Sequence, residues 1–305
     1  MPLLDADFVK KLDRLDILSK RILAGRMKGE RRTKKRGESI EFADFRDYSA
    51  GDDLRRLDWN VFARLDKLFL KLFLEEEDLS VYVLVDASAS MAYGEPSKLL
   101  FAKKVAAALG YVGLARGNRV VATAFAGAAK LGEEEPLGGA GEPAPGPGSI
   151  RGKGAAPRLF DYLEGVEARG ATDLRSAFRR FSARNQRPGI AIIVSDLLDR
   201  AGIEEALRFL QARRMDVFVI HVLAPEELEP RLAGELRLID QETRERIEVT
   251  ASYPLLKQYQ KTLERFLGLS KEYCTRRGMG YLLVSSAQPF DELVLRYLRS
   301  QRLVK

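Results

Sequence analysis

The stretch Val81-Tyr82-Val83-Leu84-Val85-Asp86-Ala87-Ser88-Ala89-Ser90 decides the fold. A short, continuous apolar run is typical of a strand that is buried on both faces of a parallel sheet. The run ends in an acid, and two serines follow it at alternate positions, so a loop that carries oxygen ligands succeeds the strand. The sequence therefore predicts an α/β domain with a site at the carboxyl end of this strand.

Apolar runs alternate with helical patterns along much of the chain. Strands are expected at residues 68–74, 119–125, 190–194, 217–222 and 281–284, with a hairpin at 236–240 and 246–250. Helices are expected at residues 7–24, 97–116, 158–168, 173–184, 203–213, 254–276 and 289–303. This alternation predicts a doubly wound, mostly parallel sheet with helices on both faces. Residues 126–157 hold nine of the 25 glycines and five of the 12 prolines, which predicts a long surface loop with room for an edge strand.

The 305 residues are enough for one large domain with an appendage. We expect residues 79–305 to form the main domain. Residues 1–78, with an N-terminal helix, a basic segment and a small charged segment that contains β-structure, are expected to pack on it. The basic segment, residues 26–36, has a charge of +6, which leaves about +1 of the net +7 for the rest. We interpret it as a solvated linker; binding of nucleic acid or an anionic surface is the alternative, disfavoured because the segment lacks interleaved aromatic residues.

The composition restricts the class of protein. No stretch approaches the ~18 consecutive apolar residues that a membrane span needs, and the first residues lack an export signal, so we expect a cytoplasmic protein without a membrane span. Cys274 is the single cysteine, permits no internal disulfide and is expected to be buried. His221 lies within an apolar strand, and we interpret it as a sheet histidine whose hydrogen bonds are satisfied.

Three separate stretches carry hard oxygen ligands. They are Asp86, Ser88 and Ser90 after the first strand of the domain, Thr172 in the loop Gly170-Ala171-Thr172-Asp173, and Asp196 after the strand at 190–194. Because the carboxyl ends of parallel strands meet at one edge of a sheet, these side chains are expected to converge. Carboxylate and hydroxyl oxygens suit Mg²⁺ or Mn²⁺ rather than zinc or copper. The alternative is that these side chains only cap backbone amides.

The same residues resemble a known metal site. Asp-x-Ser-x-Ser after an apolar strand, a Thr in a Gly-Ala-Thr-Asp loop and a strand-end Asp are similar to the metal-ion-dependent adhesion site of von Willebrand factor A domains. The resemblance implies that Ser88, Ser90 and Thr172 bind the metal, and that Asp86 and Asp196 bind it directly or through water. It also implies a vacant coordination position for an acidic residue of a partner protein. A cation with few anionic ligands stays electrophilic enough to attract one. We therefore expect a protein-interaction module and not an enzyme.

A second resemblance involves the residues before the main domain. Residues 37–64 contain Glu41-Phe42, Arg46-Asp47-Tyr48, Gly51-Asp52-Asp53, Arg55-Arg56-Leu57-Asp58-Trp59 and Ala63-Arg64. This pattern resembles the signature of the bacterial family known as domain of unknown function 58. The resemblance implies an adaptor that works with a MoxR-type AAA+ ATPase in the assembly or maturation of a client protein.

Charges of opposite sign alternate densely in residues 41–64, which indicates a salt-bridged layer. The alternative is that Arg46, Arg55, Arg56 and Arg64 form a face that contacts a partner or an anion. Trp59 is the only tryptophan, and we interpret it as the residue that anchors this layer on the main domain.

A magnesium-dependent phosphohydrolase is the enzymatic alternative, since haloacid-dehalogenase-like phosphatases also begin with a strand-end aspartate. Those enzymes place a second aspartate two residues on, as general acid, where this chain has Ser88. The substitution removes the proton donor and disfavours this alternative. No Gly-x-x-x-x-Gly-Lys-Ser/Thr loop occurs, so we expect no nucleotide hydrolysis by this chain.

Overall fold

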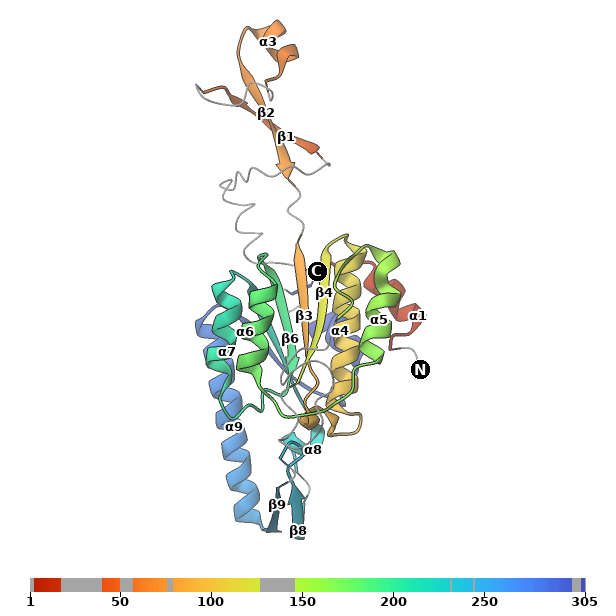
Figure 1. Cartoon of the computed structure of the whole chain (residues 1–305), viewed down its shortest axis with the longest axis vertical. Coiled ribbons are helices and arrows are strands. Elements are labelled where there is room, and N and C mark those ends of the chain that lie inside the picture. Colours follow the sequence, from red (N-terminus) through yellow and green to blue (C-terminus); the bar gives the residue numbers. More distant parts are fainter. Residues whose placement is uncertain are drawn as a thin grey trace. The chain divides into compact units, whose positions relative to one another are not determined.

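A computed structural model describes residues 3–17, 40–49, 57–75, 79–126, 146–230, 232–243, 245–297 and 303–304. The chain divides into a larger unit of Met1–Ala24 and Leu79–Lys305 and a smaller unit of Gly25–Asp78. The N-terminal helix, which the sequence groups with the smaller part, lies in the larger unit. Figure 1 shows the helices and strands of both units.

The larger unit is built on a six-stranded sheet in the order β10-β7-β6-β3-β4-β5. The strands are β3 (Ser80–Asp86), β4 (Arg119–Phe125), β5 (Ser149–Arg151), β6 (Gly189–Ser195), β7 (Asp216–Leu223) and β10 (Gly280–Ser285). All neighbours pair in parallel except β5, which pairs antiparallel with β4 at the edge. The predicted mostly parallel sheet is therefore confirmed. Residues 127–145 of the expected long loop lie outside the described residues.

Helices cover both faces of the sheet (Figure 1). One face carries α1 (Ala6–Leu12), α4 (Lys98–Ala115) and α5 (Ala156–Glu164), and the other carries α6 (Leu174–Arg184), α7 (Ile203–Ala212) and α9 (Tyr253–Arg276). Alternate side chains of β3 enter the two cores: Val83 packs with the first group, whereas Tyr82 and Leu84 pack with the second. All residues of β3 are buried, as its apolar run predicts. None of the described helices is long and apolar enough to cross a membrane.

The helix α1 is shorter than the sequence predicts, because it ends at Leu12 although the apolar pattern continues to residue 24. At the other end, α10 (Phe290–Glu292) passes into a π-helical turn, η4 (Leu293–Tyr297), within the helix expected over residues 289–303. Residues 298–302 lie outside the described residues. An isolated antiparallel bridge joins Ile17 to Val304. This bridge requires extended backbone near both termini, which the periodicity of the side chains does not reveal.

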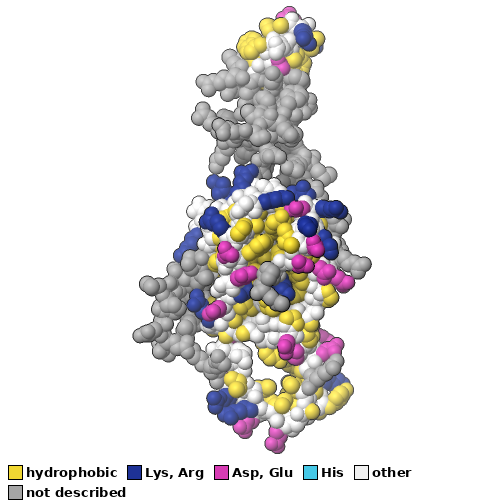
Figure 2. All heavy atoms as spheres, turned by 90° about the vertical axis from the view of Figure 1, so that its right-hand side faces the viewer, with side chains coloured by type: hydrophobic (Ala, Val, Ile, Leu, Met, Phe, Trp, Pro, Cys, Tyr) yellow, Lys and Arg dark blue, Asp and Glu magenta, His cyan; other side chains and the backbone are white. Residues whose placement is uncertain are grey.

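A hairpin of β8 (Gly234–Ile239) and β9 (Arg246–Ala251) follows the short helix α8 (Pro225–Leu228), as predicted. No residue of its two strands is buried. In Figure 1 the hairpin and the beginning of α9 extend from the end of the larger unit at which β3 ends. Hydrophobic, acidic and basic side chains lie close together at this end of the molecule (Figure 2).

The smaller unit pairs β1 (Ile40–Asp47) with β2 (Phe69–Glu75) in antiparallel orientation, and the predicted strand at 68–74 is confirmed. The short helix α3 (Trp59–Leu65) begins at Asp58, whose carboxylate accepts hydrogen bonds from the backbone N–H groups of Asn60 and Val61. Trp59 is 63% exposed and contacts Phe62 edge-on, so it does not anchor the core of its own unit. Its role against the larger unit stays a prediction.

The arginine-rich face is described only in part. Arg46 lies in β1, and Arg64 lies exposed in α3. Arg55, Arg56 and the basic segment 26–36 lie outside the described residues. The salt-bridged layer and its partner-binding alternative therefore stay predictions.

Candidate metal site

The loop after β3 places two serine hydroxyls side by side. Ser88 directly precedes a short 3-10 helix, η2 (Ala89–Ala92), and Ser90 lies within it. Their Oγ atoms are 3.0 Å apart, with Ser88 buried and Ser90 half-buried. Asp86, the last residue of β3, fixes the turn because its Oδ1 accepts a hydrogen bond from the Ser88 N–H at 2.9 Å. The spacing Asp-x-Ser-x-Ser thus brings all three oxygen-bearing side chains to the carboxyl end of β3.

The neighbouring strand β6 adds a second buried carboxylate. Ser195 ends β6 and donates from Oγ to Asp86 Oδ2 at 2.5 Å, while its Oγ accepts from the Leu197 N–H. Burial and the negative charge of Asp196 together raise the pKa of Asp86 to about 7, although the Ser195 and Ser88 hydrogen bonds act in the opposite direction. Both aspartates are fully buried. Two buried carboxylates that influence each other in this way mark a place that favours a cation.

Backbone hydrogen bonds join the Thr172 loop to the serine loop. The Ala89 N–H donates to the Gly170 carbonyl at 2.9 Å, and the Arg169 N–H donates to the Ala87 carbonyl at 2.8 Å. Gly170 has a φ of +70°, a conformation that residues with side chains rarely adopt. Thr172 follows two residues later and is half-buried. The three predicted stretches therefore meet at one end of the sheet, as their positions at strand ends imply.

The structure also places a lysine in the site, which sequence reasoning missed. Lys98, the first residue of α4, is fully buried, and its Nζ donates to Asp196 Oδ2 at 2.7 Å and to Glu227 Oε1 at 2.6 Å. Burial acts to lower the pKa of Lys98, but the two carboxylates outweigh it and raise that pKa. Ser97 caps α4 by accepting from the Leu100 N–H, so Lys98 reads in the sequence as an ordinary solvated residue of a first helical turn.

A second missed residue comes from the β8–β9 hairpin. Glu242, in the turn, accepts from Thr172 Oγ1 at 2.6 Å and from the Thr172 N–H at 3.1 Å. Both hydrogen bonds end on different oxygens of the same carboxylate. The hydroxyl that the sequence assigns to the metal is therefore bonded to an acid of the same chain, and no local signal in the sequence indicates this pairing.

The donor set fits a hard divalent cation. The five predicted residues offer hydroxyl and carboxylate oxygens, the ligands that Mg²⁺ and Mn²⁺ prefer. Adjacent ligands in an octahedral Mg²⁺ site lie about 3 Å apart, which is the separation of the Ser88 and Ser90 Oγ atoms. Within the described ranges there is no cluster of three or more His, Cys, Asp or Glu that could form a different metal centre.

The charges around the site also fit a cation. Asp86 and Asp196 are fully buried, and the fully buried Lys98 bonds to Asp196. The two buried carboxylates exceed this one buried ammonium group, and a buried excess of negative charge is unfavourable unless a proton or a metal ion offsets it. The site would therefore be stabilised by a divalent ion.

The chain's histidine and cysteine are both buried. Burial lowers the pKa of His221 to about 4, although the charge of Asp196 and a hydrogen bond with the Asp196 backbone act in the opposite direction. The Nδ1 atom of His221 bonds to the Tyr281 hydroxyl at 2.8 Å. Cys274 is buried as expected, which raises the pKa of its thiol to about 11. Neither group is suited to act as a base or nucleophile at neutral pH.

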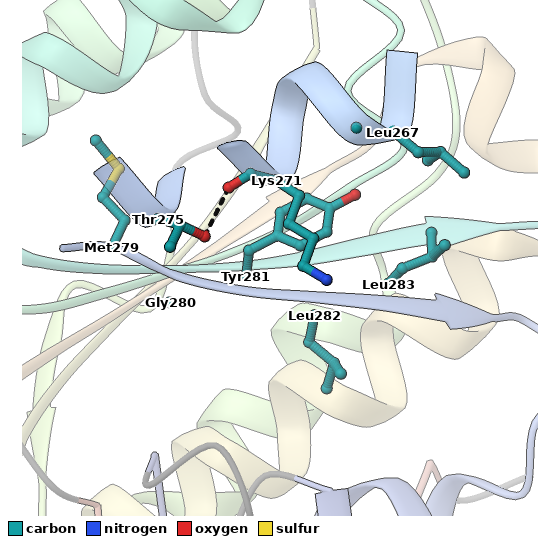
Figure 3. A pocket seen from close by; sticks show the side chains of 9 residues that line it. Leu267, Lys271, Thr275, Met279, Gly280, Tyr281, Leu282 and Leu283 are labelled. Carbon is teal, nitrogen blue, oxygen red and sulfur yellow. Dashed lines mark hydrogen bonds between the residues drawn. The ribbon is translucent and has the colours of Figure 1, made fainter. Parts of the chain in front are cut away.

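A pocket of about 490 Å³ lies elsewhere, between α9 and β10 (Figure 3). Leu267 and Lys271 line it from the helix, and Met279 and Tyr281 line it from the sheet side. It borders the first four residues of β10, whereas the candidate metal site lies at the carboxyl ends of β3 and β6, which run parallel to β10. The pocket is therefore separate from the metal site.

The family model described as "Protein of unknown function DUF58" matches residues 44–265. The chain belongs to this family. The DUF58 resemblance carried by residues 37–64 is thereby confirmed. Uncharacterized proteins from Mycobacterium bovis and two strains of Mycobacterium tuberculosis are each 28% identical to this DUF58 chain over 241 residues, which is 78% of this chain and 72% of theirs.

Two solved structures are similar to this DUF58 chain at low sequence identity. The conserved hypothetical protein BatB from Bacteroides thetaiotaomicron is 15% identical with a TM-score of 0.40, and an aerotolerance-related membrane protein from Bacteroides fragilis is 14% identical with a TM-score of 0.41. Each match covers 73% of this chain and 98% of the other. Similarity at this level adds nothing to the assignment of the site.

Proposed function

We propose that this DUF58 protein is a non-enzymatic, metal-dependent protein-interaction module whose larger unit is a von Willebrand factor A-like domain. Ser88, Ser90 and Thr172 hold Mg²⁺ or Mn²⁺, with Asp86 and Asp196 as direct or water-mediated ligands. The single observation that carries this proposal is the pair of serine hydroxyls 3.0 Å apart beside two buried carboxylates. When bound, the metal supplies a positive centre that attracts a carboxylate of the partner.

The hydrogen bonds of Asp86 hold its carboxylate in place. Its Oδ1 accepts from the Ser88 N–H and its Oδ2 accepts from Ser195 Oγ. Each carboxylate oxygen keeps a second lone pair for a cation. The arrangement holds the carboxylate in a fixed orientation, as a metal ligand needs to be held. Lys98 does the same for Asp196.

The resemblance of residues 37–64 to the DUF58 signature supports a more specific role. We infer that the chain acts as an adaptor for a MoxR-type AAA+ ATPase in the assembly or maturation of a client protein. An acidic residue of the ATPase or of the client supplies the carboxylate that completes the coordination of the metal. The protein is proposed to act in the cytoplasm, where such ATPases work.

Metal binding is tested by isothermal titration of the purified full chain with MgCl₂ and MnCl₂. We expect wild type to bind and a Ser88→Ala/Ser90→Ala variant to lose binding. Ser182→Ala is the matched control, because Ser182 is a buried serine of α6 whose hydroxyl donates to the Arg179 carbonyl of its own helix. Absence of binding by wild type at millimolar metal would contradict the proposal.

Partner binding is tested by affinity capture from native lysate in Mg²⁺ and in EDTA. We expect a MoxR-type ATPase or its client to elute in Mg²⁺ only, and to be lost with the double serine variant. Equal recovery by wild type and by a folded double variant would show that recognition does not pass through the metal.

A further inference from the structure

The hairpin β8–β9 brings one carboxylate to the candidate site in a defined way. Its turn is ordered by Asp240, whose Oδ1 accepts from the Glu242 N–H at 2.8 Å and from the Thr243 N–H at 2.7 Å. The Asp240 N–H donates to the Glu245 carbonyl at 2.9 Å, which closes the turn. Glu242 therefore projects from a formed turn and not from an unstructured loop.

The carboxylate of Glu242 ends on a residue that the proposed function assigns to the metal. It receives two hydrogen bonds from Thr172, one from Oγ1 and one from the backbone N–H. A hydroxyl donates one hydrogen bond, and the Thr172 hydroxyl donates it to Glu242. The negative charge of Glu242 also keeps other anions away from Thr172. An acid of the same chain is thus bonded directly to one of the five residues that the proposed function assigns to the metal.

The rest of the hairpin is weakly attached to the larger unit. No residue of β8 or β9 is buried, and the exposed side chains include Leu238 and Ile247. Arg200 approaches Asp240 and Glu245 of the turn at 3.8 Å each, and its side chain is 79% exposed. Exposed ion pairs of this length contribute little stability. An element with few buried contacts opens locally at low cost in free energy.

We propose that Glu242 is the chain's own substitute for the partner carboxylate: it completes the metal site while no partner is bound, and the hairpin must release it before a partner can bind. This inference rests on the proposed metal-binding function and adds a competing internal ligand to it. The hairpin then acts as a latch, which restricts binding to partners whose acidic residue outcompetes Glu242.

The test measures the coordination of Mn²⁺ in the full chain. The affinity for Mn²⁺ is determined by electron paramagnetic resonance of the free ion, and the number of water molecules bound to Mn²⁺ is determined by water proton relaxation. For Glu242→Ala we expect affinity at least about tenfold weaker than wild type. We also expect about one more bound water, because water fills the coordination position that the carboxylate leaves.

Acetate provides a second readout that a merely structural role of Glu242 would not change. Its carboxylate is small enough to enter the space left by the alanine substitution. We expect acetate to lower the number of bound waters in Glu242→Ala but not in wild type. Glu248→Ala is the matched control, because Glu248 is an exposed acid on strand β9 of the same hairpin, and we expect it to behave as wild type.

The outcomes separate this inference from the proposed function. If wild type binds Mn²⁺ through Ser88 and Ser90 but Glu242→Ala has the same affinity and the same number of bound waters, the latch is wrong and the metal site stands. If wild type binds no Mn²⁺, both are wrong. Weaker binding without an additional water would also overturn the latch, since Glu242 would then only support Thr172.

Discussion

Replacement of Lys98 by methionine tests how the charges of the site are balanced. Methionine keeps most of the length of the side chain and removes its charge. Lys98 and Asp196 are both fully buried, whereas the side chain of Glu227 is 18% exposed and keeps some contact with water. Loss of Lys98 therefore leaves chiefly Asp196 as an uncompensated buried charge. Removal of one partner of a buried ion pair typically lowers the free energy of unfolding by about 3–5 kcal/mol.

The expected fall in thermal midpoint follows from the size of the larger unit. In a unit of about 250 residues, 1 kcal/mol corresponds to about 2–4 °C, so Lys98→Met should melt about 6–20 °C below wild type. Far-UV circular dichroism in EDTA is the appropriate assay, because the larger unit contains most of the described helices. Tryptophan fluorescence reports only Trp59, which lies in the smaller unit.

Two controls make this prediction specific. Lys104→Met removes a half-buried lysine from the same helix and should change the midpoint by no more than a few degrees. The double variant Lys98→Met/Asp196→Asn should recover about 1–3 kcal/mol relative to Lys98→Met, because the unpaired charge is gone. A loss of less than about 1 kcal/mol in Lys98→Met, or strict additivity in the double variant, would refute a tight buried pair. Mg²⁺ should also stabilise Lys98→Met more than wild type, since the site then has one positive charge fewer.

Three further changes have defined outcomes. Stabilisation by Mg²⁺ should weaken below pH 7, and the affinity for Mg²⁺ should fall about tenfold per pH unit. The reason is that the pKa of Asp86 is raised to about 7, and Asp86 must lose its proton to bind the metal. Equal affinities at low and neutral pH in titration calorimetry would contradict this. In EDTA, the free energy of unfolding of His221→Gln should fall less between pH 6.5 and 4 than that of wild type, by up to about 3 kcal/mol. The reason is that the pKa of His221 is lowered to about 4 in the folded state, so the unfolded state takes up the proton first as the pH falls. Parallel curves of urea midpoint against pH for the two proteins would exclude this effect. Ser97→Ala removes the cap of α4 and should cost about 1 kcal/mol, seen as a fall in thermal midpoint of about 2–4 °C, while an unchanged midpoint would show that the cap contributes nothing.

The central sheet could be predicted because its signals are local. The run Val81–Val85 and the run Ile190–Val194 each have the length of one strand and no polar interruption, and both strands are fully buried. Residues that directly follow such strands must lie at the same edge of a parallel sheet. Asp86 and Asp196 could therefore be placed near each other from the sequence, even though they lie 110 positions apart.

The contacts of Lys98 and Glu242 could not be predicted, because they depend on distant residues. Lys98 pairs with Asp196 and Glu227, 98 and 129 positions away, and its own surroundings in the sequence indicate a solvated helix start. Glu242 reaches Thr172 only because the hairpin turns back toward the strand ends, a direction that alternation of apolar residues does not specify.

The residues that bond to the predicted metal ligands fall into two groups, and this division bears on how the site works. Lys98, Ser195 and Glu242 each bond to a predicted metal ligand and not to one another. Ser195 and Lys98 are buried and hold Asp86 and Asp196 in fixed orientations, whereas Glu242 is half-buried and comes from an exposed hairpin. The inner part of the site is thus rigid and the outer part is attached through few contacts. A site that must keep its cation while it exchanges one carboxylate for another requires this division, because the ligand that leaves has to be the one that costs least to move.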